Sequence, residues 1–174
     1  MSDIQNAFRL IGSLDLTSLS HDDTEEKIAA LCAKAVTPYG TTAAVCVYPE
    51  WVPLARKLLK KTPVKVATVV NFPAGGNDFK LMKDEIKKGL SGGADEIDAV
   101  FPYRDFLAGN TDSCRRFLDI IQRECGKHTS KIILETGELN HVSTIAAAVK
   151  LCLEYDIDFI KTSTGKTPVS ATVG

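Results

Sequence analysis

A lysine near the C-terminus is the first residue in this sequence that could do chemistry. The segment 158–166, DFIKTSTGK, brings Lys161 to the end of an apolar run and then opens into a Ser/Thr/Gly turn that carries Lys166. An ammonium group among apolar residues is costly, so the pKa of such a lysine tends to fall. A lysine of that kind is the usual nucleophile for forming a Schiff base with a carbonyl compound. The alternative is a strand-end lysine that pairs with a carboxylate.

A carboxylate that could serve this lysine occurs in the segment 93–102, GADEIDAVFP. Strand alternation places Glu96 and Asp98 on one face of this segment. Two buried acids are costly without cationic partners, and Lys161 is the natural partner for one of them. Asp98 is therefore either half of a structural ion pair or a general acid/base that moves a proton while an imine forms.

Polar residues also end other predicted strands, and each has an ordinary explanation. Asp15 and Thr17 suit a turn before the first helix slightly better than a functional role. Cys46 lies among apolar residues with nothing nearby to lower its pKa, so we interpret it as a packing residue and not a nucleophile. The segment 73–77, PAGGN, is a weak candidate for phosphate binding, and 135–139, ETGEL, could line a site without a definable role.

Short β-rich runs alternate with amphipathic helices along the chain, which implies βαβ units and a parallel sheet. No GxGxxG follows the first strand, so a dinucleotide-binding fold is disfavoured. The sequence predicts a single α/β domain over residues 1–174 with the fold of an incomplete (β/α)8 TIM barrel, about six of eight βα units, whose site lies at the strand C-terminal ends. The predicted strands are 13–16, 43–48, 64–72, 94–101, 131–135 and 158–162. One predicted helix begins within 22–26, and the other four span 51–61, 78–90, 111–125 and 142–155.

Composition excludes several classes of function. The 174 residues are 44% hydrophobic and 25% charged, with a formal net charge of −1, so no general basic surface for nucleic acid or a membrane is expected. No signal peptide and no apolar run of roughly 20 residues is present. The five cysteines show no CxxC pair and the three histidines no ligand spacing, which predicts reduced thiols, a cytoplasmic protein and no metal site.

Six motifs in order carry a family resemblance: 14–17 (LDLT), 44–49 (AVCVYP), 71–73 (NFP), 93–104, 135–139 (ETGEL) and 158–166. Together they resemble deoxyribose-phosphate aldolase of the bacterial type. The resemblance implies a class I aldolase, a lyase of deoxyribonucleotide catabolism. It implies reversible cleavage of 2-deoxy-D-ribose 5-phosphate to acetaldehyde and D-glyceraldehyde 3-phosphate, with no cofactor.

The resemblance also implies roles for particular residues. Lys161 would form the Schiff base, and Asp98 would give and take protons during the imine steps. The substrate pocket would be lined by Asp15, Thr17, Cys46, Gly165 and Lys166. A protonated imine is itself an electron sink for breaking the adjacent C–C bond, so no metal Lewis acid is required.

The chain departs from the family pattern after Lys166. The family's second lysine, in a Gly-Phe-Lys-Pro-type motif on the seventh strand, and its phosphate-binding loops are absent from these 174 residues. We therefore expect a C-terminally truncated barrel with open edges on its first and sixth strands. Three hypotheses follow. The first is an active enzyme acting on a phosphosugar or aldehyde and completed by formation of a homodimer or by a further C-terminal segment. The others are an inactive remnant that self-associates or folds poorly, and a Schiff-base aldolase for another phosphosugar.

Overall fold

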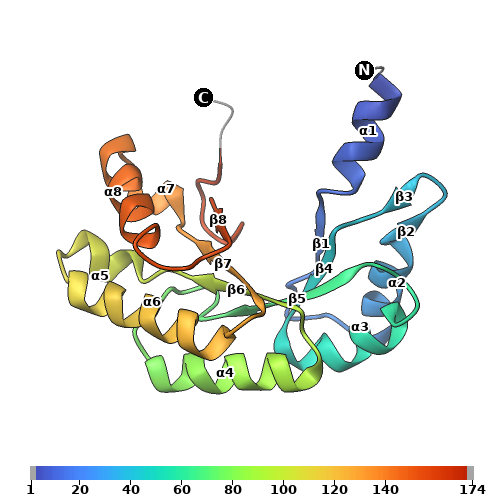
Figure 1. Cartoon of the computed structure of the whole chain (residues 1–174), viewed down its shortest axis with the longest axis horizontal. Coiled ribbons are helices and arrows are strands. Elements are labelled where there is room, and N and C mark those ends of the chain that lie inside the picture. The colour runs from blue at the N-terminus through green and yellow to red at the C-terminus, as the bar shows by residue number, and fades with distance from the viewer. Residues whose placement is uncertain (1–2, 172–174) are drawn as a thin grey trace. The chain divides into compact units, whose positions relative to one another are not determined.

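The computed structural model describes residues 3–171, and its backbone contacts divide the chain into two compact units. Unit 1 contains the described residues up to Thr68 together with Lys88–Glu96, and unit 2 contains Val69–Lys87 together with the described residues from Ile97 onward. The main sheet has the strand order β1-β4-β5-β6-β7-β8 (Figure 1). This order follows the chain, as successive βα units of a (β/α)8 barrel require. A single domain over residues 1–174 stays a prediction.

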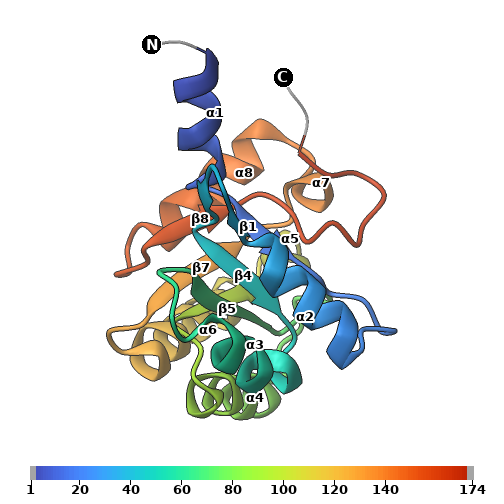
Figure 2. The same cartoon turned by 90° about the vertical axis from the view of Figure 1, so that its right-hand side faces the viewer.

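Unit 1 is built on parallel strand pairs. β1 (Asp15–Thr17) pairs with β4 (Ala44–Val47), and β4 pairs with β5 (Lys65–Val70). Helices α2 (Glu25–Lys34) and α3 (Val52–Leu59) pack against each other (Figure 2). Helix α2 begins at Glu25, within the predicted start at 22–26. The Thr24 side chain caps it there by accepting a hydrogen bond from the Lys27 N–H.

Unit 1 also contains elements that the sequence pattern did not predict. They are the helix α1 (Asp3–Ile11), the hairpin of β2 (Val36–Thr37) and β3 (Gly40–Thr41), and a 3-10 turn, η1 (Pro49–Trp51). Two-residue strands and a three-residue turn are too short to show a hydrophobic period. Residues 5–10 of α1 are exposed, so this helix lacks the strong burial that marks the predicted ones.

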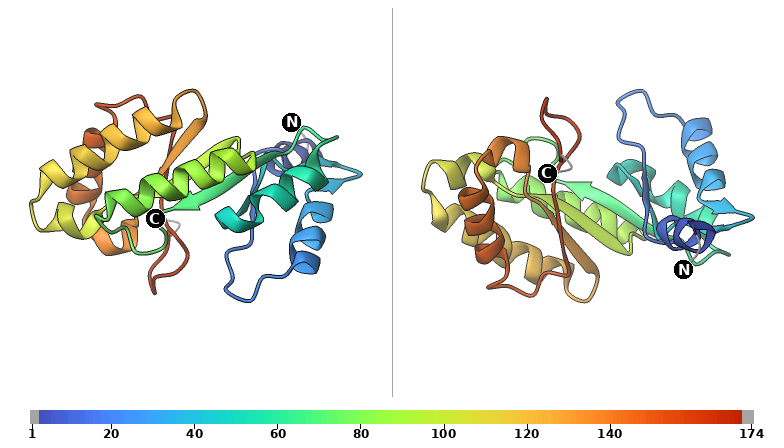
Figure 3. Two further views of the ribbon diagram at one scale, coloured as in Figure 1. Left: turned by 90° about the horizontal axis from the view of Figure 1, so that it is seen from below. Right: turned by 90° about the horizontal axis from the view of Figure 1, so that it is seen from above.

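Unit 2 holds the rest of the sheet and most of the C-terminal helices. β6 (Glu96–Val100) is followed by β7 (Thr129–Ile133), which pairs in parallel with β8 (Phe159–Lys161). The helices are α4 (Phe79–Gly92), which begins in unit 2 and ends in unit 1, α5 (Tyr103–Leu107), α6 (Thr111–Cys125), α7 (Thr136–Leu139) and α8 (Val142–Cys152). Helix α5 packs on α6, and α7 packs on α8 (Figure 3).

Helix α6 begins and ends where the sequence predicted, and its buried face and its N-cap explain why. Phe117, Leu118 and Ile121 of α6 are fully buried, and the Phe117 ring meets Phe101 edge-on at 5.9 Å between centroids. Burying each such side chain away from water contributes about 1.5–3 kcal/mol to the free energy of unfolding. Asn110 caps the helix by accepting a hydrogen bond from Ser113 N at 3.3 Å. By contrast, α8 ends three residues before the predicted boundary.

The outer strands of the sheet are open, as predicted. Among residues 3–171, β1 pairs only with β4 and β8 only with β7. Phe159 and Ile160 of β8 remain 57% and 37% exposed, although strand residues of this type are usually buried. No helix within this part of the chain is long and apolar enough to span a membrane.

Candidate active site

The predicted lysine–carboxylate pair forms in unit 2. Nζ of Lys161, the last residue of β8, lies 2.5 Å from Oδ2 of Asp98 in β6. The Asp98 side chain is 1% exposed and that of Lys161 is 31% exposed. The carboxylate is therefore held inside the protein, whereas part of the lysine side chain is open to an incoming molecule.

A second lysine joins this pair, and sequence analysis missed it. Lys131 of β7 has its Nζ 3.6 Å from Oδ1 of Asp98, and its side chain is only 7% exposed. Lysine is almost never fully buried unless it is paired. The sequence does contain a signal for this residue: Lys131 begins the run KIIL, and a lysine in an otherwise apolar buried strand indicates a buried charge.

Three adjacent strands thus place two amines on one buried carboxylate. Lys131, Asp98 and Lys161 come from β7, β6 and β8, in a sheet whose order is β6-β7-β8. When both lysines are protonated, each is a like-charge neighbour of the other beside Asp98. A like charge nearby is one general cause of a lowered lysine pKa, and the neutral amine is the form that attacks a carbonyl group.

The end of β8 and the turn after it are held by the segment that follows β7. The Lys161 carbonyl accepts a hydrogen bond from Leu134 N at 3.0 Å, and the Thr162 carbonyl accepts one from Thr136 N at 2.8 Å. Gly165 has the left-handed φ of 73°, and a Cβ placed there would meet nothing within 4 Å. Lys166 is exposed. Both predicted turn residues therefore lie in the same unit as Lys161, in an accessible turn.

The other predicted pocket residues lie together in unit 1. Thr17 of β1 is the register partner of Cys46 in β4, and Asp15 is two residues before Thr17. Cys46 is 1% exposed, and the Thr17 hydroxyl donates to the Asp15 carbonyl at 3.1 Å. The structure thus brings these three residues close to one another. Their role beside Lys161 stays a prediction.

The cysteines fit packing better than chemistry. None of the five, all of them within the described residues, forms a disulfide, and all are buried. Burial raises the pKa of Cys114 to about 11 and the pKa of both Cys125 and Cys152 to about 12, so the reactive thiolate form is disfavoured at neutral pH. Among the described residues, no group of three or more His, Cys, Asp or Glu side chains could hold a metal ion.

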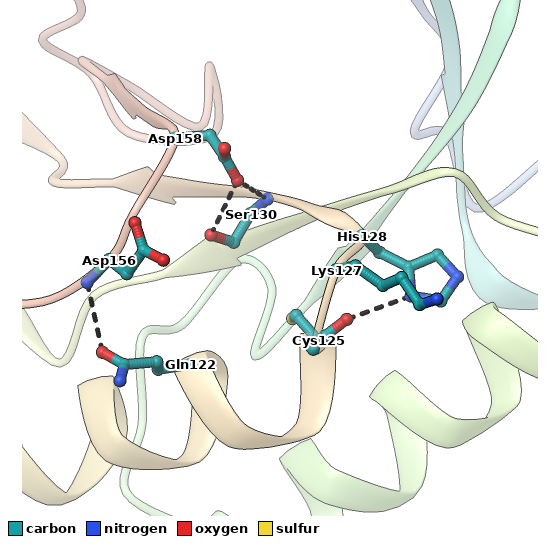
Figure 4. Close-up of a pocket in the computed structure, with 8 residues that line it drawn as sticks. Gln122, Cys125, Lys127, His128, Ser130, Asp156 and Asp158 are labelled. Atoms are coloured by element: carbon teal, nitrogen blue, oxygen red, sulfur yellow. Dashed lines mark hydrogen bonds between the residues drawn. The ribbon is translucent and has the colours of Figure 1, made fainter.

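A polar cavity of about 140 Å³ lies at the opposite end of β7 and β8 from Lys161 (Figure 4). Oδ2 of Asp158 accepts hydrogen bonds from Ser130 N at 2.8 Å and from its hydroxyl at 3.3 Å, which ties the starts of the two strands together. The side chain of Gln122 accepts a hydrogen bond from Asp156 N at 3.1 Å. These contacts give the cavity residues a structural role.

The strand order and the alternating helices define the chain as an incomplete (β/α)8 barrel, and its lysine–carboxylate pair joins β6 and β8 of that sheet. The chain belongs to the DeoC/LacD family of aldolases, whose family model matches residues 9–174. The predicted family and the predicted incomplete barrel are both confirmed.

Solved structures agree with this assignment. A Coccidioides immitis protein, provisionally named a deoxyribose-phosphate aldolase, is 30% identical with a TM-score of 0.89, and the match covers 95% of this chain and 64% of that one. The aldolase QR15 is 31% identical with a TM-score of 0.85, over 99% of this chain and 73% of that one. A tetrameric deoxyribose phosphate aldolase from Aeropyrum pernix is 27% identical with a TM-score of 0.80, over 91% and 66%. The chain therefore spans about two thirds of the length of these relatives.

Proposed function

We propose that this protein is a Schiff-base aldolase that reversibly cleaves 2-deoxy-D-ribose 5-phosphate to acetaldehyde and D-glyceraldehyde 3-phosphate. The observation that carries the proposal is the 2.5 Å contact of Lys161 Nζ with the buried carboxylate of Asp98. Membership of an aldolase family supports carbon–carbon lyase chemistry. Similarity to proteins named as deoxyribose-phosphate aldolases supports the choice of sugar.

The reaction begins with a covalent bond between lysine and substrate. The neutral amine of Lys161 attacks C1 of the open-chain aldehyde, and a proton moves from nitrogen to oxygen to give a carbinolamine. Asp98 lies within hydrogen-bond reach of Nζ, so it carries protons as the hydroxyl leaves as water and the protonated imine forms. Lys131 remains as the ammonium that pairs with Asp98 once Lys161 has become bonded to the substrate.

The protonated imine then accepts the electrons of the adjacent bond. The C2–C3 bond breaks as the C3 hydroxyl loses a proton, which releases D-glyceraldehyde 3-phosphate, and the bonding pair forms an enamine at C2. Protonation of C2 regenerates an imine, and water hydrolyses it to acetaldehyde and the free Lys161 amine. Every atom is accounted for and no electron leaves the system, so this proposed route uses no cofactor.

The remaining predicted residues are proposed to hold the substrate. Lys166 and Gly165 lie in the accessible turn after Lys161, where an ammonium and exposed backbone suit the oxygens of a phosphosugar. Asp15, Thr17 and Cys46, which lie together in unit 1, are also proposed to contact the substrate. We further propose that the protein works in the cytoplasm, in deoxyribose catabolism, as a homodimer or a larger assembly; one relative is a tetramer.

One observation favours the second candidate, a catalytically inactive remnant that self-associates. Phe159 and Ile160 lie on the open strand β8 with 57% and 37% of their surface exposed. An exposed apolar strand edge is a template for pairing with another chain. Such a protein would keep the fold of the family without its turnover.

Release of D-glyceraldehyde 3-phosphate from 2-deoxy-D-ribose 5-phosphate separates the two candidates. The aldolase proposal predicts turnover by the wild-type protein and its loss in Lys161→Arg, which keeps the positive charge beside Asp98 but cannot form an imine. Lys127→Arg, at the other end of β7, is the matched control and should retain full activity. A folded wild-type protein without turnover would favour the inactive remnant.

A further inference from the structure

Glu135, at the end of β7, is a buried charge that the mechanism above does not use. Its side chain is fully buried, and a buried carboxylate is costly unless hydrogen bonds compensate for the lost water. Both of its oxygens accept from Thr164 N at 3.3 Å, and the Thr164 hydroxyl donates a short hydrogen bond to Oε2. Thr164 lies three residues after Lys161, so this carboxylate holds the turn that follows the proposed nucleophile.

The backbone of Glu135 is also unusual. Its φ of 57° and ψ of 63° are left-handed, a conformation that costs a residue other than glycine about 1 kcal/mol or more and that occurs preferentially at functional sites. Glu135 occupies the N-cap position of α7, yet its side chain makes no capping hydrogen bond to that helix. The left-handed backbone therefore serves to turn the carboxylate toward Thr164.

The turn that Glu135 holds presents groups that suit a polar ligand. The Thr164 hydroxyl, fixed by Glu135, accepts a hydrogen bond from Lys166 N at 3.0 Å. The buried Ser163 hydroxyl oxygen has no hydrogen-bond partner among residues 3–171. A buried hydroxyl without a partner costs about 1–3 kcal/mol, which a bound oxygen atom would recover.

We infer that Glu135 is a positioning residue: its carboxylate holds the turn of residues 162–166 in the shape that binds the phosphorylated sugar beside Lys161. This inference rests on the proposed aldolase function and adds a determinant of substrate affinity to it. Acetaldehyde is too small to need the turn, whereas the sugar phosphate extends beyond the reacting aldehyde. The two ligands should therefore respond differently when Glu135 is changed.

Borohydride trapping on Lys161 at increasing ligand concentration measures both responses. Glu135→Gln replaces one acceptor oxygen by an NH2 group that cannot accept from Thr164 N, so the concentration of 2-deoxy-D-ribose 5-phosphate for half-maximal trapping should rise about tenfold. The acetaldehyde concentration for half-maximal trapping should change less than about twofold. Glu138→Gln, an exposed carboxylate in the same helix, is the charge-matched control and should behave as wild type.

Variants of Thr164 test the same contact from its other side and keep the test open if Glu135→Gln does not fold. Thr164→Val removes the hydroxyl and should raise the sugar phosphate concentration needed for half-maximal trapping. Thr164→Ser keeps the hydroxyl and should leave this concentration unchanged. Hydrogen exchange of the Thr164 and Lys166 amides should accelerate about tenfold in Glu135→Gln and remain unchanged in Glu138→Gln, whatever the activity.

The outcomes separate the inference from the function on which it rests. If the wild-type protein forms no adduct with either ligand, the proposed function is overturned, and the substrate role of the turn falls with it. If the wild-type protein forms both adducts but Glu135→Gln and Thr164→Val leave half-saturation and amide exchange unchanged, only the role of Glu135 is overturned.

Discussion

Asp98 and Lys161 are 63 residues apart in sequence, yet Oδ2 of the one lies 2.5 Å from Nζ of the other. The carboxylate is almost completely buried, and the lysine side chain is about one third exposed. An ion pair that served stability alone would gain little from such an arrangement, because burying the carboxylate is costly. The combination of a buried acid and an accessible amine is what an imine-forming site needs.

Replacing Asp98 by asparagine should affect both chemistry and stability. Asp98→Asn cannot carry protons during imine formation, so the cleavage rate should fall about 10²–10⁴-fold. It also leaves Lys131 and Lys161 without their shared carboxylate, so urea unfolding should show a loss of about 3 kcal/mol. Asp112→Asn, in the first turn of α6, is the exposed control. A wild-type cleavage rate in Asp98→Asn would exclude it as the proton carrier.

Replacing Lys131 by methionine should move the pH dependence of Schiff-base formation. The substitution removes a positive charge near Asp98 and with it a source of Coulomb repulsion on Lys161, so the proposed mechanism expects more alkaline solution to be needed for attack. The pH at which trapping is half-maximal should therefore rise in Lys131→Met. Lys127→Met makes the same charge change at the far end of the strand and should leave the midpoint unchanged. A fall of the midpoint in Lys131→Met would contradict this electrostatic role.

The contrast between Asp98 and Lys131 shows what the sequence could predict about this site. Strand alternation and the pairing rule for buried charges predicted that Lys161 pairs with one of two acids, Glu96 or Asp98, and the family resemblance pointed to Asp98. Lys131 was missed because the run KIIL does not indicate which acid would pair with its lysine. The contact between Glu135 and Thr164 depends on a left-handed backbone, which no propensity of glutamate predicts.

In the fold, too, some elements could be predicted from the sequence and others could not. The six strands and the long helices, such as α6, were predictable because their hydrophobic periods reflect burial in a sheet-and-helix core. The hairpin of β2 and β3 and the short helices α5 and α7 were not, since two to five residues carry no period. Their positions follow from tertiary contacts alone.

The buried thiols should make the protein less stable in alkaline solution. The pKa values of Cys125 and Cys152 are raised to about 12 in the folded state, whereas an unfolded cysteine titrates near 8.5. Above about pH 9 the unfolded state therefore binds fewer protons than the folded state, and the free energy of unfolding falls as the pH rises. Urea titrations between pH 7 and 11 on the wild-type protein and on Cys125→Ala/Cys152→Ala measure this slope, which should be smaller in the double variant. Equal slopes would contradict the prediction.

Asp158 should stabilise the start of the two strands that lead to the site. Asp158→Asn weakens the hydrogen bonds from Ser130 N and its hydroxyl, so the free energy of unfolding should fall by about 1–2 kcal/mol. Asp156→Asn is the matched control, because the hydrogen bond of Asp156 to Gln122 uses its backbone N–H. Equal urea midpoints for the two variants would show that the Asp158 contact adds no stability.

Capture of an acetaldehyde adduct on Lys161 tests the central claim most directly. The wild-type protein is incubated with acetaldehyde and sodium borohydride, digested and analysed by peptide mass spectrometry. Our account predicts a reduced ethyl adduct on Lys161, its loss in Lys161→Arg, and no comparable adduct on Lys127. An unmodified Lys161, or an adduct spread equally over exposed lysines, would contradict the assignment of Lys161 as the Schiff-base residue.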